Sequence, residues 1–184
     1  MNNKILLEAV DKFGTPLYIY DSNMIKSQYN RLKQSFKDVK NLQINYAVKA
    51  LSNISILKYM INMGSGIDAV SIQEVKLALK AGVNPKKILY TPNGVSIEEI
   101  KEVTELGVSI NIDNLEVLEQ FGNLNPDIPV CIRINPHIMA GGNSKISVGH
   151  IDSKFGISIH QTPHILRIVE NTKININGVH MHTG

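Results

Sequence analysis

The sequence predicts an α/β protein built as a (β/α)8 TIM barrel, in which parallel strands alternate with helices. Short runs of β-branched and apolar residues begin at positions 44, 66, 88, 108 and 130, so successive runs are 22, 22, 20 and 22 residues apart. Each interval can hold one strand, one helix and two short loops. The even spacing, and the absence of a Gly-x-Gly-x-x-Gly turn after any strand, favour a barrel over an open doubly wound sheet.

Six barrel strands can be identified, and the first five follow this period. The predicted strands cover residues 44–48, 66–70, 88–90, 108–112, 130–134 and 176–181. Leu17–Tyr20 reads as a further short strand, but it lies too far upstream to fit the period and is assigned to another layer. The interval from 130 to 176 is twice the usual step, which leaves residues 136–149 as a long polar loop. Long loops on the upper face of a barrel tend to be functional.

Helices between the strands are predicted from their start and stop signals. Ser71 with Glu74, and Ser96 with Glu99, have the spacing of a capping box, in which a hydroxyl and a carboxylate each accept a backbone N–H bond. The dipeptide Thr162–Pro163 should start a later helix. Helix ends are expected just before Gly64, Gly82, Gly107 and Gly122. Apolar residues at helical spacing, among them Ile25, Tyr29, Leu32 and Phe36, predict surfaces that face the core.

Composition places the chain among ordinary globular proteins and excludes several classes. The 184 residues include 19 Lys and Arg against 16 Asp and Glu, a small net charge that indicates no nucleic-acid or polybasic membrane surface. Of the residues, 43% are hydrophobic and 19% charged, which is enough apolar material for a core. The single cysteine, Cys131, cannot form an internal disulfide, so we expect a reducing, cytoplasmic location. No apolar run approaches the roughly 20 residues of a membrane span, and no signal peptide is recognised.

Polar residues gather at the carboxyl ends of the predicted strands, where barrel enzymes place their catalytic groups. They are Lys49, Asp68, Asn93, Asp113, Arg133, Asn135, His180 and His182. Lys49 directly follows a strand that should be buried, and a lysine there could lose its proton through desolvation and form an imine with a carbonyl group. A solvated lysine just past a strand is the alternative. Asp68 and Arg133 could likewise do no more than neutralise each other across the barrel mouth.

His180 and His182 are two residues apart on one strand, so their side chains share a face. Such a pair can bind zinc in barrel hydrolases. Against this, the other histidines lie in a loop or near a helix start, and no further cluster of strand-end ligands appears, so no metal site is assigned. His180 could be a satisfied core histidine, and His182 could stack on or hydrogen-bond a flat ligand.

Several segments carry a likeness to a known family. They are FGTPLYIYD at 13–21, YAVKALSN at 46–53, GIDAVSIQE at 66–74, RINPHIMAGGNSKISVGHIDSKFGI at 133–157 and GVHMHTG at 178–184. They resemble the diaminopimelate decarboxylases, which belong with the ornithine and arginine decarboxylases to a pyridoxal-phosphate-dependent group. YAVKA and HMHTG fit the whole group, whereas the stretch from 133 to 157 is more specific to the diaminopimelate branch. The resemblance implies a barrel of the alanine racemase type over residues 23–184, and a strand within residues 1–22 that belongs to a β-rich domain.

The resemblance also implies roles for single residues. Lys49 matches the lysine that forms an imine with the aldehyde of pyridoxal 5'-phosphate, and His182 matches the histidine that stacks on the pyridine ring. Asp68 and Arg133 match polar positions close to that lysine, and Gly184 belongs to the cofactor-binding HMHTG motif. The stretch 141–149 looks like the family's active-site loop. Cys131 lies in a strand and does not match the catalytic cysteine that a partner subunit donates in this family.

The implied reaction is the decarboxylation of meso-2,6-diaminopimelate to L-lysine in lysine biosynthesis, by a homodimer that binds no nucleic acid or membrane. The family's phosphate loop and substrate-gripping residues come later than residue 184, so we expect the chain to be an N-terminal piece with about six of eight barrel strands and little activity alone. Alternatives are an ornithine or arginine decarboxylase, a pyridoxal-phosphate-binding barrel without turnover, and a metal-dependent hydrolase.

Overall fold

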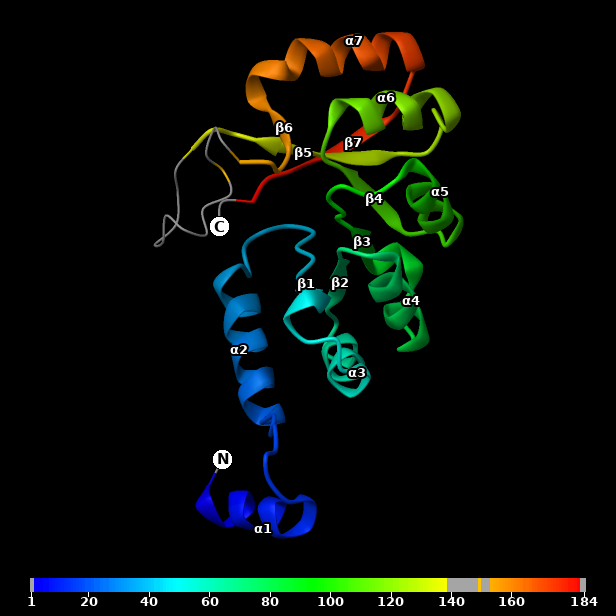
Figure 1. Cartoon of the computed structure of the whole chain (residues 1–184). Coiled ribbons are helices and arrows are strands. Elements are labelled where there is room, and N and C mark those ends of the chain that lie inside the picture. Colours follow the sequence, from blue (N-terminus) through cyan, green and yellow to red (C-terminus); the bar gives the residue numbers. More distant parts are fainter. Residues whose placement is uncertain (1, 139–148, 150–152, 183–184) are drawn as a thin grey trace. The chain divides into compact units, whose positions relative to one another are not determined.

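The computed structural model describes residues 2–138, 149 and 153–182 (Figure 1). The chain divides into two compact units, Met1–Ile44 and Asn45–Gly184. The first unit contains two helices, α1 (Asn3–Phe13) and α2 (Ser22–Ser35), and the second contains a parallel sheet with its helices. In the described part of the chain, no helix is both long enough and apolar enough to cross a membrane.

The helices of the first unit are held at their starts by side-chain caps. The Asn2 amide caps α1, which the sequence analysis did not predict, and the Asp21 carboxylate caps α2. α1 contains no buried residue, and in α2 Tyr29 alone is buried. The apolar surface predicted on α2 is covered only in part within the described residues, because Tyr29 is buried but Leu32 and Phe36 remain 45% and 47% exposed.

No strand forms over Leu17–Tyr20 among the described residues, contrary to the prediction. The four side chains are between 38% and 88% exposed. A strand requires ladder hydrogen bonds to a neighbour, and no described segment provides them here. The β-branched and aromatic composition of this stretch indicated an extended chain but could not supply a partner. Its place in a β-rich domain stays a prediction.

The sheet of the second unit confirms the predicted βα repeat. Its strands are β1 (Asn45–Ala47), β2 (Gly66–Ala69), β3 (Ile88–Tyr90), β4 (Ser109–Ile112), β5 (Val130–Asn135), β6 (Ile157–Ser158) and β7 (Ile176–His180). All neighbouring pairs are parallel, in the order β1-β2-β3-β4-β5, with β7 beside β5. The six predicted strands are present, and β6, which was not predicted, pairs with the last two residues of β5.

Helices cover the outer face of this sheet (Figure 1). They are α3 (Ile54–Asn62), α4 (Ile72–Lys80), α5 (Ile97–Glu105), α6 (Leu115–Leu124) and α7 (Thr162–Thr172). The core lies between the two layers, where strand residues such as Ile67, Ile110 and Ile132 pack against helix residues such as Val75 and Phe121. Because side chains alternate along a strand, the residues between these apolar ones face the inside of the curved sheet.

The predicted helix starts are confirmed, although the carboxylates of the two capping boxes bind elsewhere. The Ser71 and Ser96 hydroxyls accept the N–H groups of Glu74 and Glu99, as expected. The Glu74 carboxylate, however, accepts the N–H of the residue before the cap. The Glu99 carboxylate reaches across to α4, where it accepts the N–H of Ile72. α7 begins at Thr162, as predicted.

Three of the four glycines expected after helix ends have positive φ angles, and the fourth prediction is wrong. Gly64, Gly82 and Gly107 have φ angles of 97°, 94° and 74°. Gly122 instead lies inside α6, which continues to Leu124. A Cβ at Gly122 would lie 2.5 Å from the Thr172 hydroxyl oxygen. The glycine is therefore explained by the close approach of α6 to the end of α7 and not by a helix stop.

Candidate active site at the carboxyl ends of the strands

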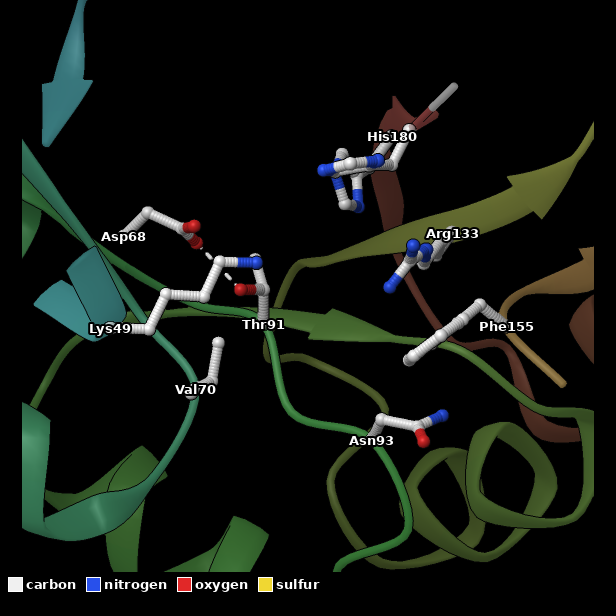
Figure 2. Close-up of a pocket in the computed structure, with 9 residues that line it drawn as sticks. Lys49, Asp68, Val70, Thr91, Asn93, Arg133, Phe155 and His180 are labelled. Atoms are coloured by element: carbon white, nitrogen blue, oxygen red, sulfur yellow. Dashed lines mark hydrogen bonds between the residues drawn. The ribbon is translucent and has the colours of Figure 1, made fainter. Parts of the chain in front are cut away.

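A cavity of about 350 Å³ opens at the carboxyl ends of the strands in the second unit (Figure 2). It is lined by Lys49, Asp68, Val70, Thr91, Asn93, Arg133, Phe155, His180 and His182. Six of these belong to the eight strand-end residues singled out in the sequence. They come together because parallel strands end at the same edge and their inward side chains converge. Asp113 and Asn135 do not line the cavity.

Lys49 enters the cavity from a single 3-10 turn, Val48–Ala50, directly after β1. Val48 is fully buried, and the Tyr46 hydroxyl donates to the Leu51 carbonyl at 3.1 Å, so both sides of the turn are fixed. The Lys49 side chain itself is exposed. The burial that was expected to desolvate this amine is therefore not provided by the described residues. Figure 2 shows the amine pointing toward Asp68 and Thr91.

Asp68 is oriented by the neighbouring strand and not by Arg133. The Thr91 hydroxyl donates to the Asp68 carboxylate at 2.5 Å, and the Thr91 N–H donates to the Ala69 carbonyl at 2.8 Å. Among the described residues Asp68 and Arg133 form no direct ion pair, but the charge of Asp68 acts on the Arg133 guanidinium from across the cavity, so mutual neutralisation across the barrel mouth stays a prediction. The two groups face the cavity from different strands.

Arg133 is half-buried on β5, with its guanidinium against the ring of Phe155 at 4.7 Å from Cζ to the ring centroid. Burial lowers the pKa of this guanidinium, while the negative charges of Asp113 and Asp68 act in the opposite direction. Asp113 is 8% exposed and accepts a hydrogen bond from the Asn93 amide. Asn93 thus links the cavity wall to a buried carboxylate that stabilises the arginine from a distance.

Burial favours the neutral form of His180, the last residue of β7, and of His182 just after it. Burial lowers the pKa of His180 and of His182, and the positive charge of Arg133 lowers both further. Lys49 adds to the effect on His182, whereas Asp68 opposes it in both. A neutral imidazole can lie against an aromatic ligand without burying a charge. Among the described residues, no group of three or more His, Cys, Asp and Glu side chains is arranged to hold a metal ion.

Sequence reasoning missed three cavity residues. Val70 and Thr91 directly follow β2 and β3, so the rule that located Asp68 and Asn93 could have found them. Phe155 could not be found in this way, because it precedes β6, a strand of two residues that has no periodicity to detect. Gly184 and residues 141–148 of the expected active-site loop lie outside the described residues.

Comparison with known proteins identifies similar sequences and structures. Residues 22–184 match the family model described as the pyridoxal binding domain of pyridoxal-dependent decarboxylases. The chain is 35% identical over 180 residues to the diaminopimelate decarboxylase of Methanothermobacter thermautotrophicus and 38% identical over 179 residues to that of Campylobacter jejuni. These alignments cover 97% and 94% of this chain but 42% and 44% of the relatives, so the chain spans less than half of their length.

A solved structure agrees with these sequence matches. The crystal structure of diaminopimelate decarboxylase from Helicobacter pylori complexed with L-lysine has a TM-score of 0.84 and 33% sequence identity. The match covers 100% of this chain and 47% of that one. The curved parallel sheet is thus the same as that of a decarboxylase barrel, which confirms the predicted fold class.

Proposed function

The chain belongs to the pyridoxal-dependent decarboxylases, whose pyridoxal-binding domain it matches over residues 22–184, and on that basis we propose that the protein is a diaminopimelate decarboxylase. It would remove carbon dioxide from meso-2,6-diaminopimelate and release L-lysine. The main observation behind the proposal is that Lys49, Arg133 and His182 line one cavity. The names of the similar proteins and the L-lysine bound by the Helicobacter pylori relative support the choice of substrate.

The residues of the cavity fit pyridoxal 5'-phosphate, the cofactor that the family implies. Lys49 supplies a primary amine, the one nucleophile that an aldehyde cofactor requires. Arg133 supplies N–H donors without a carboxylate partner in the described part of the chain, which suits an anionic ligand. His182 supplies a flat ring, and burial lowers its pKa and so favours the neutral form that suits contact with an aromatic ring. We propose Lys49, Asp68, Arg133 and His182 as the residues that hold the cofactor.

Each side chain has a distinct task in this proposal. When bound, the cofactor supplies a conjugated ring that accepts the electron pair left by departing carbon dioxide. The Lys49 amine would hold the cofactor through its aldehyde group and would lie beside the reacting carbon of the substrate. His182 would fix the plane of the ring, so that the bond to be broken can stand perpendicular to it. Asp68, held by Thr91, keeps a negative charge close to the lysine.

Chemical trapping tests the assignment of Lys49. We expect that pyridoxal phosphate and borohydride label the protein and that peptide mass mapping places the label on Lys49. Lys49→Ala should remove the label without unfolding the chain, since this exposed amine packs against no core residue. Lys58→Ala, which removes an exposed lysine from α3, is the matched control and should label normally. A trapped adduct in Lys49→Ala would refute the proposal.

Substrate choice is tested by carbon dioxide release from the complete protein. Release from meso-diaminopimelate, but not from ornithine or arginine, is expected. The opposite preference would identify the other branch of the group, which shares the YAVKA and HMHTG motifs. Binding of the cofactor without release from any of the three would identify a barrel without turnover. The 184-residue chain alone is expected to have little or no activity.

Location and assembly belong to the same proposal. The free thiol of Cys131 is compatible with a reducing compartment, and we place the protein in the cytoplasm. Family resemblance supports a homodimer, which sedimentation of the complete protein would test.

A further inference from the structure

Phe155 lines the cavity, and neither the sequence nor the proposed mechanism gives it a role. Its ring centroid is 4.7 Å from the Cζ atom of Arg133 and 5.1 Å from the ammonium of Lys154. Both distances are within the roughly 6 Å over which an aromatic face attracts a cation. Arg133 lines the cavity, whereas Lys154 is exposed outside it. Figure 2 shows the ring beside the guanidinium, at the edge of the space that Lys49 enters.

The backbone around Phe155 is fixed to the strand that carries Arg133. The Ser153 hydroxyl accepts the Phe155 N–H at 3.3 Å. Gly156 has a φ angle of 79°, and a Cβ there would lie 3.0 Å from the Asn135 nitrogen of β5. Ile157 is 2% exposed, and β6 pairs with the end of β5. The ring and the guanidinium are therefore attached to adjacent segments that are paired through β5 and β6.

The acids around Arg133 make their described hydrogen bonds to other groups and act on the guanidinium only from a distance. Asp113 accepts from the amides of Asn93 and Asn114, and Asp68 accepts from the Thr91 hydroxyl. In the ranges that the structure describes, no carboxylate lies within ion-pair distance of the guanidinium. A long arginine side chain without an ionic partner samples many rotamers unless another contact restricts it.

We propose that Phe155 is a positioning residue, whose ring holds the Arg133 guanidinium so that its N–H donors face the cavity beside Lys49 and His182. The inference rests on the proposed function, since the ligand that these donors would meet is the pyridoxal cofactor. A cation–π contact acts on the charge of the guanidinium and provides no conventional hydrogen-bond acceptor, so the N–H donors stay available to a ligand. An acidic residue in the same place would instead occupy those donors.

The pKa values of the two histidines depend on the position of Arg133, and they can be measured without any cofactor. The charged groups that act on His182 are Arg133, Lys49 and Asp68, and His180 is affected by Arg133, Asp68 and His182. Releasing the guanidinium from the cavity would weaken the repulsion that lowers the pKa of each imidazole. The pKa of His182 should therefore rise when Phe155 no longer holds Arg133.

An NMR pH titration of the histidine rings in the complete, cofactor-free protein tests this step. Arg133→Met should raise the pKa of His182, and Phe155→Leu, which keeps most of the volume but removes the aromatic face, should raise it by a smaller amount. Phe155→Tyr keeps the face and should titrate like the unchanged protein. In an Arg133→Met background, Phe155→Leu should have no further effect, because the residue through which it acts is gone.

Cofactor affinity gives the second measurement. Phe155→Leu should weaken the binding of pyridoxal phosphate about threefold to tenfold, the range that corresponds to loss of one partly buried cation–π contact. Phe155→Tyr should bind normally, and in the Arg133→Met background the Leu substitution should not weaken binding further. Thermal unfolding of each variant separates these effects from loss of the fold.

Two results would overturn the inference. The first is that Arg133→Met raises the pKa of His182 while Phe155→Leu leaves that pKa unchanged. The other is a Phe155→Leu effect of equal size with and without Arg133, which would show that the ring acts on its own. Failure of the unchanged protein to bind pyridoxal phosphate at Lys49 would refute the proposed function instead, and the titration would still decide whether Phe155 positions Arg133.

Discussion

At the scale of single residues, Asn111 is wholly buried on β4, between the core residues Ile110 and Ile112, so its side chain faces the inside of the sheet. Among the described residues, neither polar atom of its amide has a hydrogen-bond partner. A buried amide in this state costs roughly 1–3 kcal/mol of stability.

We expect Asn111→Leu to leave the free energy of unfolding unchanged or to raise it by up to roughly 1–3 kcal/mol, since an unsatisfied group is replaced by an apolar one. Urea unfolding measures the change. Asn135→Leu is the matched control. The buried Asn135 side chain accepts the N–H of His137 at 3.0 Å, so losing this hydrogen bond should lower the free energy of unfolding. Equal destabilisation of both variants would contradict the prediction and indicate a bound partner at Asn111.

Tyr90 should make the protein less stable as the pH becomes alkaline. Burial raises the pKa of its hydroxyl, and the hydrogen bond to Glu99 and the negative charge of that carboxylate raise it further. A raised pKa in the folded state means that the tyrosine contributes its stability below about pH 10, its unfolded pKa, and loses this contribution as the pH rises above it. The difference in unfolding free energy between the unchanged protein and Tyr90→Phe should be constant from pH 7 to 9 and should shrink above about pH 10. A difference that stays constant to higher pH would contradict this assignment.

At the scale of elements, the contact between α6 and α7 depends on the missing side chain of Gly122. A methyl group there would lie 2.5 Å from the Thr172 hydroxyl oxygen and 3.2 Å from the Ile174 Cβ. We expect Gly122→Ala to destabilise the protein by about 1–3 kcal/mol, although alanine is the better helix former. Asn123→Ala, at an exposed neighbouring position of the same helix, should be neutral or stabilising. Thermal unfolding of the two variants compares them, and equal midpoints would refute the explanation.

The elements that sequence patterns predicted correctly are those whose signal is local. The β-branched runs at Ile44, Gly66 and Val130 mark strands buried on one face, and Ser71 and Ser96 mark helix starts through their own hydrogen bonds. The failures involve partners distant in the chain. Gly122 was interpreted as a stop signal because its contact with Thr172 lies 50 residues away, and Glu99 was paired with its own cap although it binds α4.

At the scale of the whole molecule, the two units differ in how many side chains they bury. α1 contains no buried residue, and α2 contains one, whereas the second unit holds a core that extends over every strand from β2 to β6. We expect amide hydrogen exchange in α1 to be much faster than in α4, because opening α1 exposes almost no apolar surface. Mass spectrometry of deuterium uptake measures this. Equal protection in the two helices would mean that α1 is covered by a surface outside the described residues.

The candidate site could be predicted from the sequence to the extent that it obeys barrel geometry. Lys49, Asp68, Arg133 and His182 were located because each lies toward or just after the carboxyl end of a predicted strand, and the structure brings all four to one cavity. Their mutual contacts could not be predicted, since side chains that share a barrel mouth can bond in several combinations. Asp68 bonds to Thr91, and Arg133 lies over the ring of Phe155, and neither partner could be read from the opposite charges of the two residues.

The position of Glu99 limits how segments of this fold can be exchanged between related genes. Its carboxylate, from α5, accepts the first N–H of α4 and the hydroxyl of Tyr90, and the Lys76 ammonium of α4 also binds Glu102 of α5 at 2.7 Å. A recombination crossover near Gly94 would keep every strand and helix intact yet separate these donors from their acceptors. Chimaeras that inherit residues 66–105 from one parent should therefore survive more often than chimaeras divided within that block.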